Sequence, residues 1–122
     1  MNASTEEKRK IMATKIIDNV AKTAAMTSAI FSQIPGMGVT TLSKLYFDMA
    51  KELAALFNQE LETSVARSIV IAGCENHAKA IFNKSVLGWI PLIGNLINAK
   101  ITFTLTQNIG WFFYNHFVET YK

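Results

Sequence analysis

The stretch 34-IPGMG-38 decides how the chain is divided, because it has a close copy in 90-IPLIG-94. In each stretch a proline is followed three residues later by a glycine, and these are the two prolines of the sequence. The residue before a proline avoids the α-helical backbone region, so each proline is expected to end a helix. The two stretches therefore predict two helical hairpins, each folded at an I-P-x-x-G turn.

Composition is compatible with a helical bundle that has an apolar surface, or with a membrane-associated protein. Half of the 122 residues are hydrophobic and 17% are charged, against roughly 25% charged residues in an ordinary soluble domain. The length predicts a single domain over residues 1–122 with a buried core, and the composition excludes a disordered chain.

The cysteine count and the N-terminus bear on the compartment. The single Cys74 offers no intramolecular disulfide, and the N-terminal segment mixes acids and bases instead of forming a secretory signal. We therefore expect a cytoplasmic protein, or one on the cytoplasmic face of the inner membrane.

Apolar residues recur at helical spacing in four segments. The first hairpin, about residues 4–58, is expected to hold helices over 4–33 and 39–58. The expected apolar stripe of the first helix is Ile16, Val20, Ala24, Thr27 and Phe31, and that of the second is Leu42, Leu45, Met49, Leu53 and Leu56. The second hairpin, about residues 63–119, is expected to hold helices over 63–87 and from the second turn to about 118. The alternation in 101-ITFTLT-106 leaves a strand as the competing interpretation, but Ile101, Leu105 and Ile109 keep helical spacing across it.

The two hairpins also resemble each other in sequence. A shift of 56 residues places Lys44 on Lys100, Phe47 on Phe103 and Phe57 on Phe113, in addition to the paired turns. Such self-similarity indicates an internal repeat, with chance as the alternative. The predicted fold is all-α, a four-helix antiparallel bundle made of two similar helical hairpins.

An up-down-up-down bundle brings both I-P-x-x-G turns to one end. This tip is expected to present Ile34, Pro35, Met37, Val39, Trp89, Ile90, Leu92 and Ile93. A cationic collar of Lys44, Lys84 and Lys100 is expected to surround it, because the segments between Asp18 and Asp48 and between Glu75 and Glu119 contain no acid. Apolar side chains ringed by lysines suit an anionic membrane surface, and Trp89 suits its interface.

Three other interpretations of the tip stay open. The patch can bind a protein partner, as in an adaptor or a toxin-neutralising protein, or a second copy of the chain. The apolar side chains can fold back onto the core and have no function. The runs from Ser85 to Ala99 and from Ile101 to Val118 can insert together as a bent hairpin, although the first is 15 residues long and a spanning helix needs about 20.

The sequence offers little catalytic or metal-binding chemistry. Cys74 and His77 share a helix face, but a structural zinc site needs about four ligands, and a thiol among apolar residues is a poor nucleophile. The segment GMGVTT lacks the lysine of a phosphate-binding loop, and no basic helix indicates nucleic-acid binding. We expect no enzyme activity, no cofactor, no metal and no nucleic-acid partner.

The run 34-IPGMGVTTLSKLYFDMAKELAALFNQEL-61 and the later run 90-IPLIGNLINAKITFTLTQNIGWFFYNHF-117 carry a family resemblance. Over about residues 20–119 the chain resembles an uncharacterised helical family, number six-nine-seven in the domain-of-unknown-function series. Members of this family occur behind Era-like GTPase domains and in YcjF-type bacterial inner-membrane proteins. Leu92 departs from the family pattern, which usually has Gly there. The resemblance implies an all-helical, membrane-associated accessory domain and supplies no catalytic residues.

Overall fold

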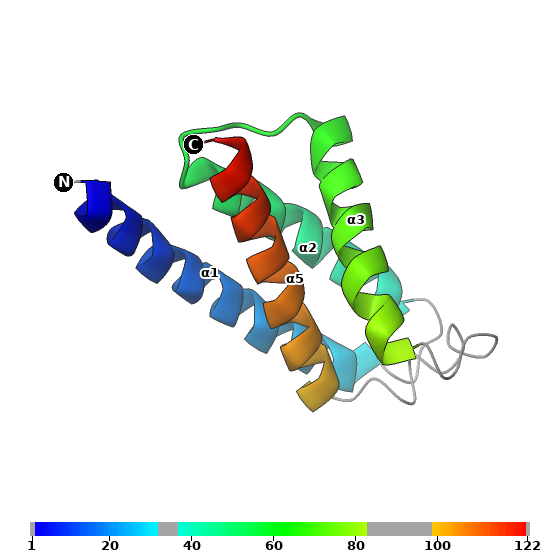
Figure 1. The fold of residues 1–122 in the computed structure, drawn as a ribbon. Coiled ribbons are helices and arrows are strands. Elements are labelled where there is room, and N and C mark those ends of the chain that lie inside the picture. The colour runs from blue at the N-terminus through cyan, green and yellow to red at the C-terminus, as the bar shows by residue number, and fades with distance from the viewer. Residues whose placement is uncertain (1, 32–36, 83–98, 122) are drawn as a thin grey trace.

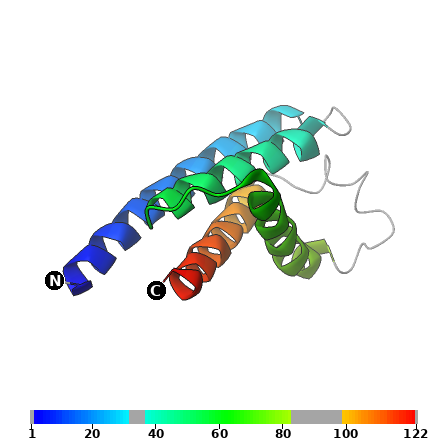
Figure 2. The same ribbon diagram turned by 90° about the horizontal axis from the view of Figure 1, so that it is seen from above.

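The computed structural model describes residues 2–31, 37–82 and 99–121, and these residues form an all-α bundle. Its helices are α1 (Asn2–Phe31), α2 (Met37–Ala55), α3 (Thr63–Phe82) and α5 (Ala99–Thr120). Successive helices run in opposite directions, which confirms the predicted antiparallel order (Figure 1). Helices α1 and α2 lie side by side in one layer, and α3 and α5 form a second layer that crosses it (Figure 2). The helical interpretation of residues 101–106 is confirmed, because they lie within α5.

The hydrophobic core lies mainly between α5 and the layer of α1 and α2. Its largest fully buried apolar side chains are Ile17, Met49, Leu53, Ile109, Phe113 and Phe117. The stripe predicted for α2 is confirmed, since Leu42 is buried with Met49 and Leu53, and Leu45 and Leu56 pack half-buried beside them. Burial of this apolar stripe stabilises α2 more than its intrinsic helix propensity does.

The buried face of α1 agrees with the predicted stripe at Ala24 and otherwise differs from it. The fully buried positions are Ala13, Ile17, Ala21 and Ala24. Of the predicted residues, Ile16 and Val20 lie half-buried at the edge of this face. Helix α1 also begins at Asn2, two residues before the predicted start. Alanine has no side chain beyond Cβ, so the small face, and not the larger residues beside it, permits the closest approach of α5.

The end of α2 is fixed by Asn58. Its backbone φ of 59° lies in the left-handed region, which asparagine tolerates better than most residues. The Gln59 N–H donates to the carbonyl of Ala54, and the Asn58 N–H donates to that of Ala55. These two bonds form a Schellman motif that satisfies the last carbonyls of the helix and turns the chain into the link toward α3.

Candidate functional site

The helix ends that flank the two predicted turns meet at one end of the bundle, here called the tip end (Figure 1). Most of the predicted contact residues lie outside the described residues, namely Ile34, Pro35, Trp89, Ile90, Leu92, Ile93 and the collar residue Lys84. Met37 and Val39 lie in the first turn of α2. The helix ends meet as expected, while the role of the tip side chains stays a prediction.

The predicted collar is weaker at Lys44 than the sequence indicates. Lys44 Nζ lies 3.2 Å from Asp48 Oδ2, one helical turn away, and both side chains are exposed. An exposed pair of this kind stabilises little, but it offsets part of the lysine charge. Lys100, at the start of α5, is exposed, and within the described residues it has no ion-pair partner. Of the two, Lys100 is therefore the freer cation for a ligand.

The face of α1 that points away from the core carries a second candidate surface, which the sequence prediction missed. We call it the outer stripe of α1, and its members are Lys8, Ile11, Met12, Lys15, Lys22 and Met26. All six are exposed, although three of them are large hydrophobic residues. The signal in the sequence is the seven-residue spacing of Lys8, Lys15 and Lys22, which apolar periodicity alone does not single out.

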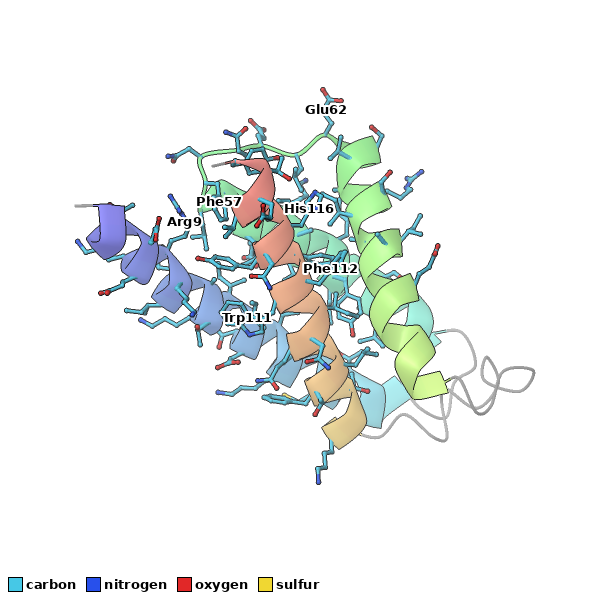
Figure 3. The ribbon with its side chains drawn as sticks, in the orientation of Figure 1. Arg9, Phe57, Glu62, Trp111, Phe112 and His116 are labelled. Carbon is cyan, nitrogen blue, oxygen red and sulfur yellow. The ribbon has the colours of Figure 1, made fainter. Side chains whose placement is uncertain are left out.

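A recess opens between the N-terminal part of α1 and the C-terminal part of α5. It encloses about 880 Å³ and is lined on the α5 side by Trp111, Tyr114 and Tyr121. Arg9 closes one side: its guanidinium carbon lies 4.4 Å from the ring centre of Phe57, and its Nε donates to the Leu56 carbonyl at 3.3 Å (Figure 3). This cation–π contact anchors α1 to the end of α2.

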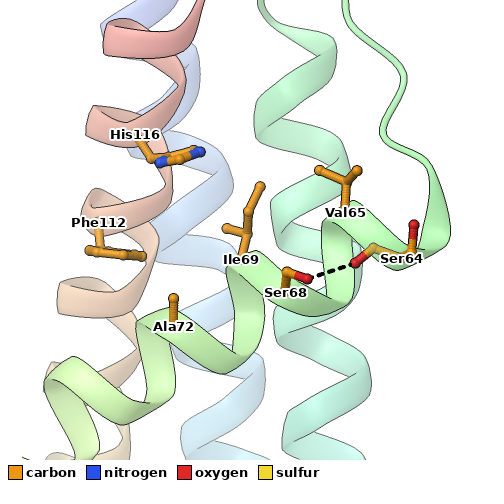
Figure 4. A pocket seen from close by; sticks show the side chains of 7 residues that line it. All are labelled: Ser64, Val65, Ser68, Ile69, Ala72, Phe112 and His116. Carbon is orange, nitrogen blue, oxygen red and sulfur yellow. Dashed lines mark hydrogen bonds between the residues drawn. The ribbon is translucent and has the colours of Figure 1, made fainter.

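A shallower groove lies between α3 and α5 (Figure 4). It encloses about 420 Å³, and Val65 and Ile69 of α3 face Phe112 and His116 of α5 across it. Val65 is exposed and Phe112 is half-buried, so the groove presents apolar surface to solvent. Its volume is in the range of small ligand sites, but its charged or polar groups are confined to serine hydroxyls and His116.

The buried polar groups are structural in character. Tyr46 of α2 and Thr106 of α5 share a hydrogen bond of 2.8 Å between their hydroxyl oxygens. Burial raises the pKa of the Tyr46 phenol above its ordinary value. Thr102 Oγ1 is also buried, and no hydrogen-bond partner for it is found in the structure described here. Burial likewise raises the pKa of the half-buried Cys74 thiol, which keeps it protonated and a weak nucleophile.

Among residues 2–31, 37–82 and 99–121 no group of three or more His, Cys, Asp or Glu side chains is arranged to hold a metal ion. Within the same ranges, every helix is too short or too polar to cross a bilayer.

Comparison with protein families, characterised proteins and solved structures finds no match to this chain. The class that the fold defines is an all-α helical bundle. The resemblance to family six-nine-seven stays a prediction.

Proposed function

We propose that this protein is a non-enzymatic helical module that docks on an anionic membrane surface through its tip end. The cellular site that fits this proposal is the cytoplasmic face of a bacterial inner membrane. The module needs no cofactor in this role, because binding depends on apolar contact and lysine charge alone.

The observation that carries the proposal is the separation of charge along the bundle. The described acids Glu6, Glu7, Glu52, Glu60, Glu62 and Glu119 lie toward the end opposite the tip, Asp18 and Asp48 lie near the middle, and Glu75 alone of the described acids lies in the tip half of its helix. The lysines Lys22, Lys44 and Lys100 lie in the tip halves of α1, α2 and α5, so among the described side chains cations outnumber acids toward the tip end. Met26 adds an apolar side chain there that is 66% exposed. Lysines near an anionic bilayer contribute about 1 kcal/mol each.

The 56-residue repeat belongs to the same proposal, since it would give each hairpin an equivalent tip. Paired positions have matching environments in the two hairpins. Phe57 and Phe113 are both buried, Phe47 and Phe103 are both half-buried, and Lys44 and Lys100 are both exposed. This agreement supports descent of the hairpins from one ancestral unit.

Co-sedimentation with vesicles tests the proposal. The protein should bind vesicles that contain phosphatidylglycerol and stay free of pure phosphatidylcholine vesicles, and added salt should release it. Replacing Lys44 and Lys100 by Gln should weaken binding between about fivefold and about 30-fold, because Lys100 contributes roughly 1 kcal/mol and Lys44, seven residues from Met37, contributes less. The matched control replaces Lys51 and Arg67 by Gln, which removes the same charge from exposed sites on α2 and α3.

The control cations lie far from the proposed contact. Lys51 is 14 residues from Met37, or about 21 Å along the helix, and the screening length in physiological salt is about 8 Å. Their loss should therefore leave end-on binding unchanged. Absence of binding to anionic vesicles at low salt would refute the membrane proposal, and equal losses for both double variants would refute the tip as its site.

A protein-interaction role is the second candidate, and the apolar groove between α3 and α5 favours it. In this alternative the groove, or the tip itself, is covered by a second copy or by a partner protein. Analytical ultracentrifugation over a range of concentrations tests self-association. A dimer that is lost on changing Val65 to Asp would place the contact at the groove, because a buried unpaired carboxylate opposes association.

A further inference from the structure

The outer stripe of α1 lies opposite the face that packs in the core. An α-helix turns by roughly 100° per residue, so Lys8, Lys15 and Lys22, at seven-residue intervals, drift only slightly around the axis. Ile11 and Met26 fall between and beyond them on the same side. In both views α1 forms one edge of the molecule (Figures 1 and 2), so this face has no covering helix in the described part of the bundle.

The apolar members of the stripe are among the most exposed hydrophobic side chains in the described structure. Ile11 is 57% exposed, Met12 is 52% exposed and Met26 is 66% exposed. The lysines between them have no acidic partner within 4.0 Å among the described residues. The stripe therefore combines free cations with uncovered apolar groups over 19 residues, about 27 Å of helix.

We propose that α1 lies along an anionic lipid surface with this outer stripe, as a contact surface additional to the tip end. The inference rests on the proposed membrane function and specifies how the bundle is oriented. Apolar side chains would enter the boundary between head groups and acyl chains, while the lysine stems extend their ammonium groups to the phosphates.

The residue types favour lipid over a protein or nucleic acid as the occupant. Protein interfaces concentrate binding energy in Trp, Tyr and Arg, and none of these residues is in the stripe. Arg is also the residue suited to bidentate recognition of a fixed phosphate or carboxylate. Lysine is a flexible point charge, which suits mobile, diffuse head groups. The charge and the composition of the stripe therefore complement an anionic bilayer.

Side-on docking differs measurably from end-on docking. Lys8 lies 23 residues from Phe31 at the tip end of α1, about 35 Å along the helix. Lys15 is 16 residues from the same end, about 24 Å. Both distances exceed the screening length of about 8 Å. A bundle that stands only on its tip should therefore be insensitive to these two lysines, while a bundle that lies on α1 should need them.

The first test replaces Lys8 and Lys15 by Gln and measures binding to vesicles of phosphatidylglycerol mixed with phosphatidylcholine. We expect about 30-fold weaker binding than the wild type. The control variant, Lys51→Gln with Arg67→Gln, removes equal charge from other helices and should bind as the wild type does. Circular dichroism should show all variants folded, since the four side chains are exposed.

The second test addresses the apolar members with a matched pair. Ile11→Ser with Met12→Ser should weaken vesicle binding about tenfold or more, because two apolar side chains no longer enter the bilayer. Val65→Ser with Ile71→Ser makes the same kind of change on α3, where the original side chains are 43% and 50% exposed. This second variant should keep wild-type binding.

The outcomes separate the inference from the function on which it rests. If the wild type binds anionic vesicles and both α1 variants bind equally well, the outer stripe is refuted while tip docking survives. If the wild type fails to bind anionic vesicles at low salt, the inference and the membrane function are both overturned. Selective loss in the two α1 variants supports side-on docking.

Discussion

Helix α5 makes a close, glycine-mediated contact with α1 on one side and with α3 on the other, but the two contacts differ in how tightly they are packed. On the side of α1, a Cβ added at Gly110 would lie 2.8 Å from Cγ1 of Ile17 and 2.9 Å from its Cγ2. On the side of α3, a Cβ added at Gly73 would lie 2.9 Å from Cε1 of Phe113 and 3.2 Å from Cδ2 of Phe112. In each contact a glycine lets two helices approach closely.

The difference lies in what surrounds each glycine. Ile17 is fully buried in a row of alanines, and α1 continues to pack against α5 on both sides of it. Near Gly73 the seam ends in the open groove toward Val65, and Phe112 is only half-buried. The contact between α1 and α5 is therefore rigid, because side chains fill the whole interface between the two helices. The contact between α3 and α5 can adjust, because the groove leaves one edge of that interface open. Alanine substitutions at the two glycines should separate these two cases.

Gly110→Ala should destabilise the protein by about 2 kcal/mol. Overpacking of a filled core costs about 1–3 kcal/mol, and the better helix propensity of alanine offsets part of that cost. Ile17 is β-branched and has few alternative rotamers in a helix, so it cannot easily move aside. Urea unfolding followed by circular dichroism measures the change.

A double-mutant cycle with Ile17→Ala checks the cause. Ile17→Ala should cost less in the Gly110→Ala background than in the wild type, because the smaller side chain removes the clash. Additive losses would mean that Gly110 is sensitive for another reason, and the proposed tightness of the α1 seam would then be wrong.

The α1 seam also shows how far sequence reasoning reaches. Helix type and order followed from two prolines and from apolar spacing, because both are local signals. The buried face of α1 did not follow from the sequence, since hydrophobicity favoured Ile16 and Val20 over Ala21. Whether alanine is buried depends on how closely α5 approaches, and that depends on Gly110, 89 residues away from Ala21.

The candidate surfaces, too, could be predicted only in part from the sequence. The meeting of four helix ends followed from topology, but the ion pair of Lys44 with Asp48 and the outer stripe of α1 required the helix faces to be assigned. Periodicity alone gives two apolar directions on α1, one through Ile17 and one through Ile11. Only packing shows which direction is exposed.

Tyr46→Phe should have an intermediate effect and bears on the interior contact of α5 with α2. Loss of the phenol hydroxyl removes its hydrogen bond with Thr106 and should cost about 1 kcal/mol at neutral pH. Thr106 limits the loss, because a threonine in a helix can donate to a carbonyl one turn back. Urea unfolding at neutral pH measures the difference from the wild type.

The same variant should alter the response to alkali. Burial raises the pKa of Tyr46 in the folded protein, so its contribution to stability is fully present below the unfolded pKa of about 10. Above that pH the unfolded tyrosine ionises first, and the contribution is lost as pH rises toward the folded pKa. The difference between Tyr46→Phe and the wild type should therefore stay constant up to about pH 9 and shrink as the pH rises above about 10. A constant difference would show that the phenol does not titrate differently on unfolding.

Gly73→Ala should have the smallest effect, a loss of less than about 1 kcal/mol, although its closest contact is nearly as short as that at Gly110. The closest neighbour, Phe113, is fully buried and cannot turn aside. Relief at Gly73 therefore comes from a small outward shift of α3 toward the open groove, together with rotation of the half-buried ring of Phe112. The same gain in helix propensity applies as at Gly110, so the comparison between the two alanine variants isolates the cost of packing. Urea unfolding of both proteins under identical conditions measures it. If Gly73→Ala destabilises as much as Gly110→Ala, the groove offers no relief, and α3 is held as firmly against α5 as α1 is.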